Sequence, residues 1–333
     1  MTEPLLEIKD LKKYFPVQKG FFKRTVGFVR AVDGVSLTVQ PGETLGIVGE
    51  SGSGKTTLGR TLLRLYEPSA GEVDMRVDGK VVHVTQLDGP ELRTLRRNAQ
   101  MIFQDPYASL NPRMTVLESV GEPLFVNHIA SGRELEDRVT EVIQQVGLRK
   151  EHLRRYPHSF SGGQRQRIGI ARALVVKPRL IVADEPVSAL DVSIQAQILN
   201  LLKEMQSQYQ LTYLFISHAM NVVRYMCDRI GVMYAGKLVE LGTKNQVMSN
   251  PKHPYTEALL SSVPRTTSRT RSLRIVSAGE VPDLANLPSG CVFHPRCKHV
   301  IDKCMTEVPR LRTLNDGRQV SCHRSEELSL QGI

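Results

Sequence analysis

The 333-residue sequence has no run that approaches the roughly 18 apolar residues needed by a membrane-spanning helix. Its segment 1–13 is polar and lacks the apolar core of a secretion signal. These absences argue against an integral membrane protein and against a secreted one. We therefore expect a chain that stays in the cytoplasm and that acts at a membrane, if at all, as a peripheral protein.

Acidic residues are outnumbered: 34 Asp and Glu against 44 Lys and Arg give a net charge of +10. Such a balance suits a nucleic acid, an anionic membrane surface or no specific partner. We rank a solvated face first, anionic lipid second and nucleic acid last. The surplus gathers in two segments, at Lys9, Lys12, Lys13, Lys19, Lys23, Arg24 and Arg30, and at Arg265, Arg269, Arg271 and Arg274.

Cysteine is scarce, and its distribution is uneven. Cys227 stands alone, and we expect it to be a buried core thiol. Cys291, Cys297, Cys304 and Cys322 cluster near the C-terminus, which in a cytosolic chain favours a metal site over disulfides. Their spacing leaves zinc and an iron–sulfur cluster comparable, with unligated thiols as a third alternative.

The region from 1 to about 255 alternates short apolar runs with helical patterns. Buried strands are predicted at Thr44–Val48, Leu180–Ala183 and Tyr213–Ile216, and a helix at Thr56–Leu65. This alternation predicts an α/β fold with a parallel sheet covered by helices.

Two further segments interrupt or follow this pattern. The segment 106–174 has few strand signals and a helical pattern at Leu135–Val146, so we predict a helical subdomain inserted in the sheet domain. A linker rich in Ser, Thr and Arg is predicted at Val263–Arg274. We place the boundary of a small C-terminal domain, with its four cysteines, at 256–333.

The segment Gly49–Thr56 (GESGSGKT) fits the phosphate-binding loop motif and lies between a predicted strand and a predicted helix, as the motif requires. Glycines let the backbone N–H groups face phosphate oxygens, and the helix N-terminus favours negative charge. Lys55 is predicted to reach the β- and γ-phosphates, and Thr56 to ligate Mg²⁺. The predicted nucleotide contacts of this loop are Gly49, Glu50, Ser51, Gly52, Ser53, Gly54, Lys55, Thr56 and Thr57.

Two carboxylates follow the predicted strand Leu180–Ala183. Asp184 can hold Mg²⁺ through water, and Glu185 can orient and polarise an attacking water. Together with the upstream loop, this pair predicts nucleotide hydrolysis.

Ser161 and Gln164 form an S-x-x-Q capping box before a helix predicted from about Gly163 to Val175. The exposed N–H groups of such a helix start offer a second anion site. Two phosphate sites beside a single nucleotide motif make sense if the cap of one chain faces the loop of another.

These motifs together resemble those of the ATP-binding-cassette ATPases. The signature is Ser161–Arg167 (SGGQRQR), in which the resemblance assigns Ser161, Gly162, Gly163 and Gln164 to the nucleotide of a second chain. It also implies that Gln104 contacts Mg²⁺ and the attacking water, that His218 contacts the γ-phosphate, that Asp191 links the two sites and that Phe15, with Tyr14 as an alternative, stacks on adenine. The implied mechanism is a dimer that closes on two ATP molecules and reopens on hydrolysis.

The segment Asn250–Leu260 (NPKHPYTEALL) resembles that of the ATPases of oligopeptide and dipeptide importers, most closely their second, "F", type. This implies a heterodimer with a paralogous ATPase, two permeases and an extracytoplasmic binding protein, all at the cytoplasmic face of the cell membrane. It also implies a [4Fe–4S] cluster, rather than zinc, on the four C-terminal cysteines. The chain departs from the family at Phe160, where leucine is common, and at Ala219, where a carboxylate usually follows the histidine.

Other functions remain open at this point. The same role could serve an oligosaccharide, nickel or glutathione instead of a peptide. A soluble cassette ATPase that acts on ribosomes or DNA usually carries two cassettes or long insertions, and the sequence has neither. A regulatory cassette without hydrolysis is disfavoured by Glu185 and His218.

Overall fold

A computed structural model describes residues 3–20, 24–262 and 282–333. These residues form two compact units, which we describe separately. We call 6–38, 44–75 and 216–333 the loop unit, and 3–5, 39–43 and 76–215 the helical unit, with the undescribed residues excepted. The predicted linker Val263–Arg274 and its basic run lie outside the described residues.

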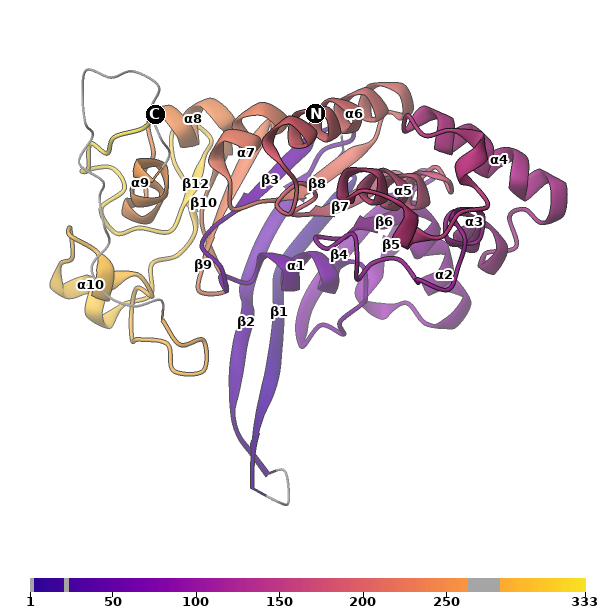
Figure 1. Cartoon of the computed structure of the whole chain (residues 1–333). Coiled ribbons are helices and arrows are strands. Elements are labelled where there is room, and N and C mark those ends of the chain that lie inside the picture. Colours follow the sequence, from indigo (N-terminus) through magenta and orange to yellow (C-terminus); the bar gives the residue numbers. More distant parts are fainter. Residues whose placement is uncertain (1–2, 21–23, 263–281) are drawn as a thin grey trace. The chain divides into compact units, whose positions relative to one another are not determined.

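The loop unit contains two sheets. In one, β3 and β9 are parallel, β10 is antiparallel to β9, and β12 and β11 of the C-terminal segment extend the same sheet. In the other, β1 is antiparallel to β4 and lies beside β2, with which it forms the long ribbon in Figure 1. The strands are β1 (Leu6–Lys19), β2 (Arg24–Val39), β3 (Thr44–Val48), β4 (Ala70–Val77), β9 (Arg229–Tyr234), β10 (Lys237–Thr243), β11 (Arg312–Thr313) and β12 (Gln319–Val320).

Strand β3 forms because all five of its residues are buried, as expected of a parallel strand covered on both faces. A Cβ on Gly46 of β3 would lie 2.7 Å from the Sγ atom of Cys227, so this thiol packs directly on the strand. The prediction that Cys227 is a core thiol is confirmed. The helices of this unit are α1 (Lys55–Leu62), α7 (Met220–Met226), α8 (Lys244–Ser249), α9 (Pro254–Ser261) and α10 (Asp302–Thr306), with a 3₁₀ turn at His294–Arg296.

Helix α1 ends three residues earlier than predicted. Arg64 adopts a left-handed conformation with φ of 51°, and the N–H of Leu65 donates to the carbonyl of Arg60. This is a helix-ending motif that usually has glycine at the left-handed position. Because arginine occupies it here, the sequence contains no stop signal at this point.

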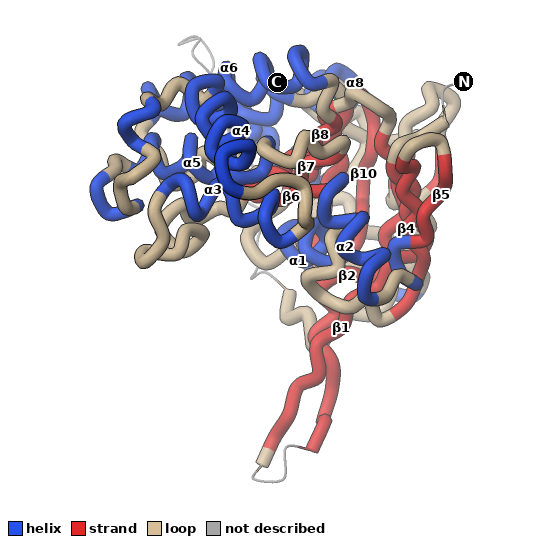
Figure 2. Tube along the Cα trace, turned by 90° about the vertical axis from the view of Figure 1, so that its right-hand side faces the viewer, coloured by secondary structure: helices blue, strands red, loops and turns tan. Residues whose placement is uncertain are grey.

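The helical unit combines three strands with a group of helices. Strand β6 is parallel to β7, and β8 lies beside β7. Helices α3, α4 and α5, which lie within the predicted helical segment 106–174, pack on one another, as Figure 2 shows in blue. The elements are β5 (Lys80–His83), α2 (Gly89–Asn98), β6 (Ala99–Ile102), α3 (Val116–Val126), α4 (Gly132–Gln145), α5 (Gly162–Leu174), β7 (Leu180–Asp184), α6 (Val192–Tyr209) and β8 (Thr212–Ile216), with 3₁₀ turns at Val84–Gln86, Lys150–His152 and Pro157–Ser159. Across the part of the chain that is described, no helix is both long and apolar enough to cross a membrane.

A buried polar cluster ties α9 to β10 in the loop unit. The carboxylate of Glu240 accepts hydrogen bonds from the N–H of His253 (3.0 Å) and the hydroxyl of Thr256 (2.6 Å). The Nδ1 atom of His253 accepts from the N–H of Tyr255 at 3.1 Å. Burial lowers the pKa of His253 to about 3, so this imidazole stays neutral in the folded chain.

This histidine predicts a loss of stability in acid. Between its unfolded pKa of 6.5 and its folded pKa of about 3, the unfolded chain binds one more proton than the folded chain. Stability should therefore fall as pH decreases, by about 2 kcal/mol at pH 5 from this group. His253→Asn keeps an acceptor for the Tyr255 N–H. In urea unfolding, the difference in the free energy of unfolding between pH 7 and pH 5 should be smaller by about 2 kcal/mol in this variant than in the wild type. Equal pH dependence in the two proteins would contradict the assignment.

Candidate nucleotide site

The predicted phosphate loop is a tight turn between β3 and α1. Gly49 and Gly54 have φ of 155° and 101°, and a Cβ on either would lie within 2.2 Å of a backbone oxygen, that of Met233 or Ala31. Only glycine fits such positions. Because α1 begins at Lys55, the N–H groups of its first turn adjoin the loop. This arrangement provides the concave set of donors that an anion requires.

The side chain of Lys55 lies along the inner side of this loop and is buried. Its Nζ donates to the carbonyls of Gly49 and Glu50, both at 2.8 Å, and approaches the Ser53 hydroxyl at 3.4 Å. The structure therefore brings together the lysine and three of the other predicted loop residues. These bonds hold the ammonium of Lys55 against the backbone at the start of the loop.

Two more predicted residues belong to the loop unit. His218 is exposed and lies between β8 and α7, where the N–H of Ser217 donates to the carbonyl of Ile47 on β3. The ring of Phe15 makes an edge-to-face contact with Tyr66 at 5.4 Å between centroids. The neighbouring hydroxyl of Tyr14 donates to Asp33 at 2.5 Å, so Tyr14 is engaged elsewhere.

In the helical unit, the two carboxylates end β7 as predicted. Asp184 is the fully buried last residue of the strand, and Glu185 follows it with φ of 46°. A left-handed conformation is uncommon for a residue other than glycine, and such strain often occurs at functional sites. The amide Nε2 of Gln104 donates to Glu185 Oε2 at 3.0 Å. The structure thus pairs two of the three predicted catalytic residues.

The signature segment forms the predicted helix start. Ser161 caps α5 with both halves of the capping box: the Gln164 N–H donates to Ser161 Oγ at 3.3 Å, and the Ser161 N–H to Gln164 Oε1 at 3.1 Å. A Cβ on Gly163 would lie 2.6 Å from Ile194 of α6, so α6 packs closely on this turn. Asp191 is exposed at the start of α6. Ser161 is exposed, which leaves the helix start accessible to a ligand.

A contact that the sequence does not predict lies behind the phosphate loop. The guanidinium of Arg296, in the C-terminal segment, makes two hydrogen bonds to the carboxylate of Glu50. These residues are 246 positions apart, and no spacing or motif connects them.

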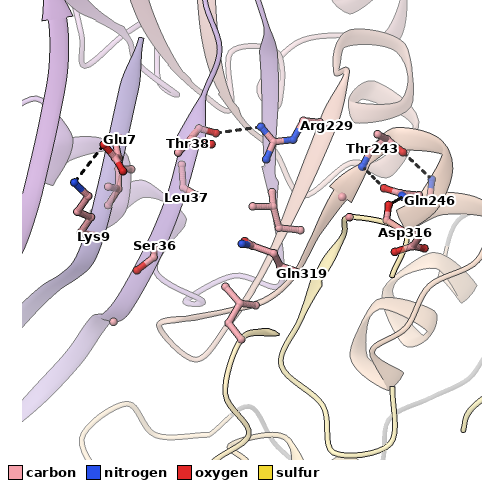
Figure 3. Close-up of a pocket in the computed structure, with 16 residues that line it drawn as sticks. Glu7, Lys9, Ser36, Leu37, Thr38, Arg229, Thr243, Gln246, Asp316 and Gln319 are labelled. Carbon is pink, nitrogen blue, oxygen red and sulfur yellow. Dashed lines mark hydrogen bonds and ion pairs between the residues drawn. The ribbon is translucent and has the colours of Figure 1, made fainter. Parts of the chain in front are cut away.

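A pocket of about 530 Å³ lies elsewhere in the loop unit (Figure 3). Its polar groups pair with one another: Lys9 lies 3.3 Å from Glu7, and Arg229 donates to the Thr38 carbonyl at 3.1 Å. The residues that line it include none of the predicted nucleotide contacts. We therefore do not assign it to this site.

Comparison with known families gives two matches. Residues 32–188 match the model described as ABC transporter, and residues 239–304 match the one described as Oligopeptide/dipeptide transporter, C-terminal region. The second match includes three of the four C-terminal cysteines and Arg296.

Curated proteins are similar over nearly the whole chain. The oligopeptide transport ATP-binding protein AppF of Bacillus subtilis is 52% identical over 324 residues, which cover 96% of this chain and 97% of AppF. The di/tripeptide transport ATP-binding protein DppF of Pseudomonas aeruginosa is 47% identical over 325 residues, 98% and 99% of the two chains.

Solved structures are similar to a large part of the chain. A dimeric post-hydrolysis state of the ATP-binding cassette MJ0796, bound to ADP and Pi, has a TM-score of 0.62 and 31% identity, and the match covers 72% of this chain and 98% of that one. The cbiO1 protein of Clostridium perfringens, part of an ABC transporter complex, has a TM-score of 0.60 and 26% identity over 74% and 90%. The α/β cassette fold predicted from the sequence is confirmed.

Proposed function

We propose that this chain, which belongs to the oligopeptide and dipeptide transport ATP-binding proteins of the ABC transporter family, hydrolyses ATP to drive peptide import. The observation that carries this proposal is the extent of the similarity. The similarity includes both the cassette and the C-terminal segment. The family model that matches the C-terminal segment is described as Oligopeptide/dipeptide transporter, C-terminal region. Relatives that match over nearly the full length are named for transport of oligopeptides or of di- and tripeptides.

The loop residues bind the nucleotide in this proposal. Lys55 exchanges its carbonyl partners at Gly49 and Glu50 for β- and γ-phosphate oxygens. Thr56 and, through water, Asp184 would hold Mg²⁺, which would neutralise charge on the phosphates. Phe15 stacks on the adenine.

The catalytic step is assigned to three side chains. Glu185 accepts a proton from the attacking water, and Gln104, which donates to Glu185, orients that water and would also contact Mg²⁺. His218 contacts the γ-phosphate. The exposed helix start at Ser161–Gln164 then binds the nucleotide of a second chain, and Asp191 links the two sites of the dimer.

The assembly follows from this dimer. We assign as partners a paralogous ATPase, two permeases and an extracytoplasmic binding protein, with no nucleic acid, and place the chain peripherally at the cytoplasmic face of the membrane. The cassette occupies 1–255, with its helical subdomain at about 106–174, and the C-terminal extension occupies 256–333.

Reconstitution tests the proposal. The chain should co-purify with two multi-spanning permeases, and its ATPase activity in vesicles should rise when the binding protein is loaded with a di- or oligopeptide. If only an oligosaccharide, nickel or glutathione stimulated the activity, the proposed role as a transport ATPase would stand, but the proposed peptide substrate would be wrong. If the ATPase activity were the same with and without the permeases and the binding protein, the chain would be a non-transport ATPase, and the proposal would be overturned.

We also propose that the four C-terminal cysteines hold a [4Fe–4S] cluster. The pKa of Cys291 and of Cys322 is raised in each case to about 11, mainly by burial and in smaller part by neighbouring thiols of the group. None of the four is in a disulfide. Within the described residues, no three His, Cys, Asp or Glu side chains are grouped to share one metal ion. The choice of a cluster over zinc rests on the resemblance of this C-terminal segment to that of the importer ATPases.

Metal analysis decides between these alternatives. Protein purified without oxygen should contain iron and acid-labile sulfide in equal amounts and absorb visible light. Cys304→Ser should lose most of both, because it removes a ligand, whereas Cys227→Ser should keep them, because that thiol packs on β3. Zinc without sulfide, or no metal in the wild type, would overturn the cluster assignment.

A further inference from the structure

A residue of the C-terminal segment, Arg296, forms an ion pair with Glu50 of the phosphate loop. Arg296 lies in the turn at His294–Arg296, and its two terminal nitrogens lie 2.8 and 3.1 Å from the two carboxylate oxygens of Glu50. Glu50 is the second residue of the loop, directly after Gly49. Two parallel bonds between a planar guanidinium and a carboxylate fix orientation as well as distance.

The backbone of the same residue is held as well. The N–H of Glu50 donates to the hydroxyl of Tyr255 at 2.7 Å, and the Tyr255 side chain is fully buried. The rings of Tyr234, Tyr255 and Phe293 pack with centroids 4.5 to 5.5 Å apart. The group that holds Glu50 is therefore rigid, and it is built from β9, α9 and the segment before the Arg296 turn.

The ion pair is shielded from solvent on the arginine side. The Arg296 side chain is 9% exposed and that of Glu50 30%. The hydrogen bonds that Arg296 donates to Glu50 are the main cause that raises the pKa of Arg296, so the arginine stays charged. A carboxylate so close to a phosphate site would repel the nucleotide, and the adjacent guanidinium offsets this charge.

The pair also acts on the lysine of the site. Lys55 donates to the carbonyls of Gly49 and Glu50, so its position depends on where this half of the loop lies. If Glu50 moved, both carbonyls and the ammonium would move with it. Misplacement of a binding group by about 1 Å can cost as much as 100-fold in rate.

We propose that Arg296 is a positioning residue of the nucleotide site, which holds Glu50 so that the phosphate loop is preorganised for ATP. The C-terminal extension thereby sets the affinity of the cassette for nucleotide. This inference rests on the proposed function for the identity of the ligand. The effect of Arg296 on the conformation of the loop is independent of that function.

Substitution on both sides of the pair tests the proposal in the full-length chain. Arg296→Met removes the charge and both bonds while it keeps an unbranched apolar stem, and it should weaken binding of a fluorescent ATP analogue about tenfold. The KM for ATP should rise by a similar factor with kcat within about twofold, because the residue touches no reacting atom. Arg296→Lys, which keeps the charge and can make one bond, should recover part of the affinity.

A double-mutant cycle separates the pair from general destabilisation. Glu50→Gln should weaken ATP binding. Because the two residues act as a unit, the double variant of Arg296→Met and Glu50→Gln should bind ATP no more weakly than the single variant with the lower affinity. The matched control is Arg312→Met, which breaks another arginine–glutamate pair of the extension, with Glu326 at 2.8 Å, and should leave ATP affinity unchanged.

Hydrogen exchange without nucleotide distinguishes this inference from the proposed function. The amides of residues 50–55 should exchange faster in Arg296→Met than in the wild type, and this result needs no ATP binding. A wild-type chain that binds no ATP would refute the nucleotide function, while the exchange result would still decide whether Arg296 holds the loop. Unchanged exchange and unchanged ATP affinity in folded Arg296→Met would overturn the inference. If Arg296→Met does not fold, unchanged exchange and affinity in Glu50→Gln would overturn it.

Discussion

Glu185→Gln should lower the rate of ATP hydrolysis by about 10²- to 10⁴-fold and leave ATP affinity within about twofold of the wild type. Glutamine keeps the size of the side chain and can still bond to Gln104, which lies 3.0 Å from Glu185 Oε2. It cannot accept the proton of the attacking water. Because ATP would close the dimer and hydrolysis would reopen it, the variant should also accumulate as an ATP-bound dimer.

The measurement is phosphate release by the isolated chain, together with size-exclusion chromatography in ATP and Mg²⁺. The isolated chain is needed because an active paralogous partner could conceal the loss. The matched control is Glu204→Gln, on the exposed side of α6, which removes the same charge away from the site and should hydrolyse ATP normally. A Glu185→Gln protein that keeps more than about a tenth of wild-type activity would show that another group accepts the proton.

Local features of this fold could be predicted from the sequence. The strands β3 and β7 are short, fully buried and mostly apolar, and the capping box of Ser161 and Gln164 depends on residues three positions apart. Their geometry follows from neighbours in the chain, so pattern and propensity suffice. The glycines of the phosphate loop are also explained locally, by backbone conformations that exclude side chains.

Features that depend on tertiary packing could not be predicted in this way. Arg64 takes a left-handed conformation that the sequence does not signal, so the predicted helix extends past the true end of α1. The contact of Gln104 with Glu185 joins two loops, and the family resemblance implied only that Gln104 contacts Mg²⁺ and the attacking water. The pair of Arg296 and Glu50 has no motif at all, because an ion pair imposes no fixed spacing on the sequence.

Gly54→Ala should destabilise the chain by about 2 to 6 kcal/mol and lower the affinity for ATP at least 100-fold in any folded fraction. The backbone at Gly54 has φ of 101°, and an added Cβ would lie 2.0 Å from the Ala31 carbonyl oxygen. That oxygen belongs to the backbone of β2, so the clash is relieved only if the loop or the strand moves. Movement of the loop would displace Lys55, the next residue, from the carbonyls that now hold it.

Gly52→Ala in the same loop is the matched control. Gly52 also has a positive φ, of 78°, but an added Cβ would meet no atom within 4 Å. It should therefore cost only the backbone strain, about 1 kcal/mol, and bind ATP within a fewfold of the wild type. Urea unfolding and titration with a fluorescent ATP analogue measure both effects. If the two variants behaved alike, positive φ alone would govern the loop; if Gly54→Ala is much the worse, the close approach of β2 to the loop maintains the shape of the phosphate site.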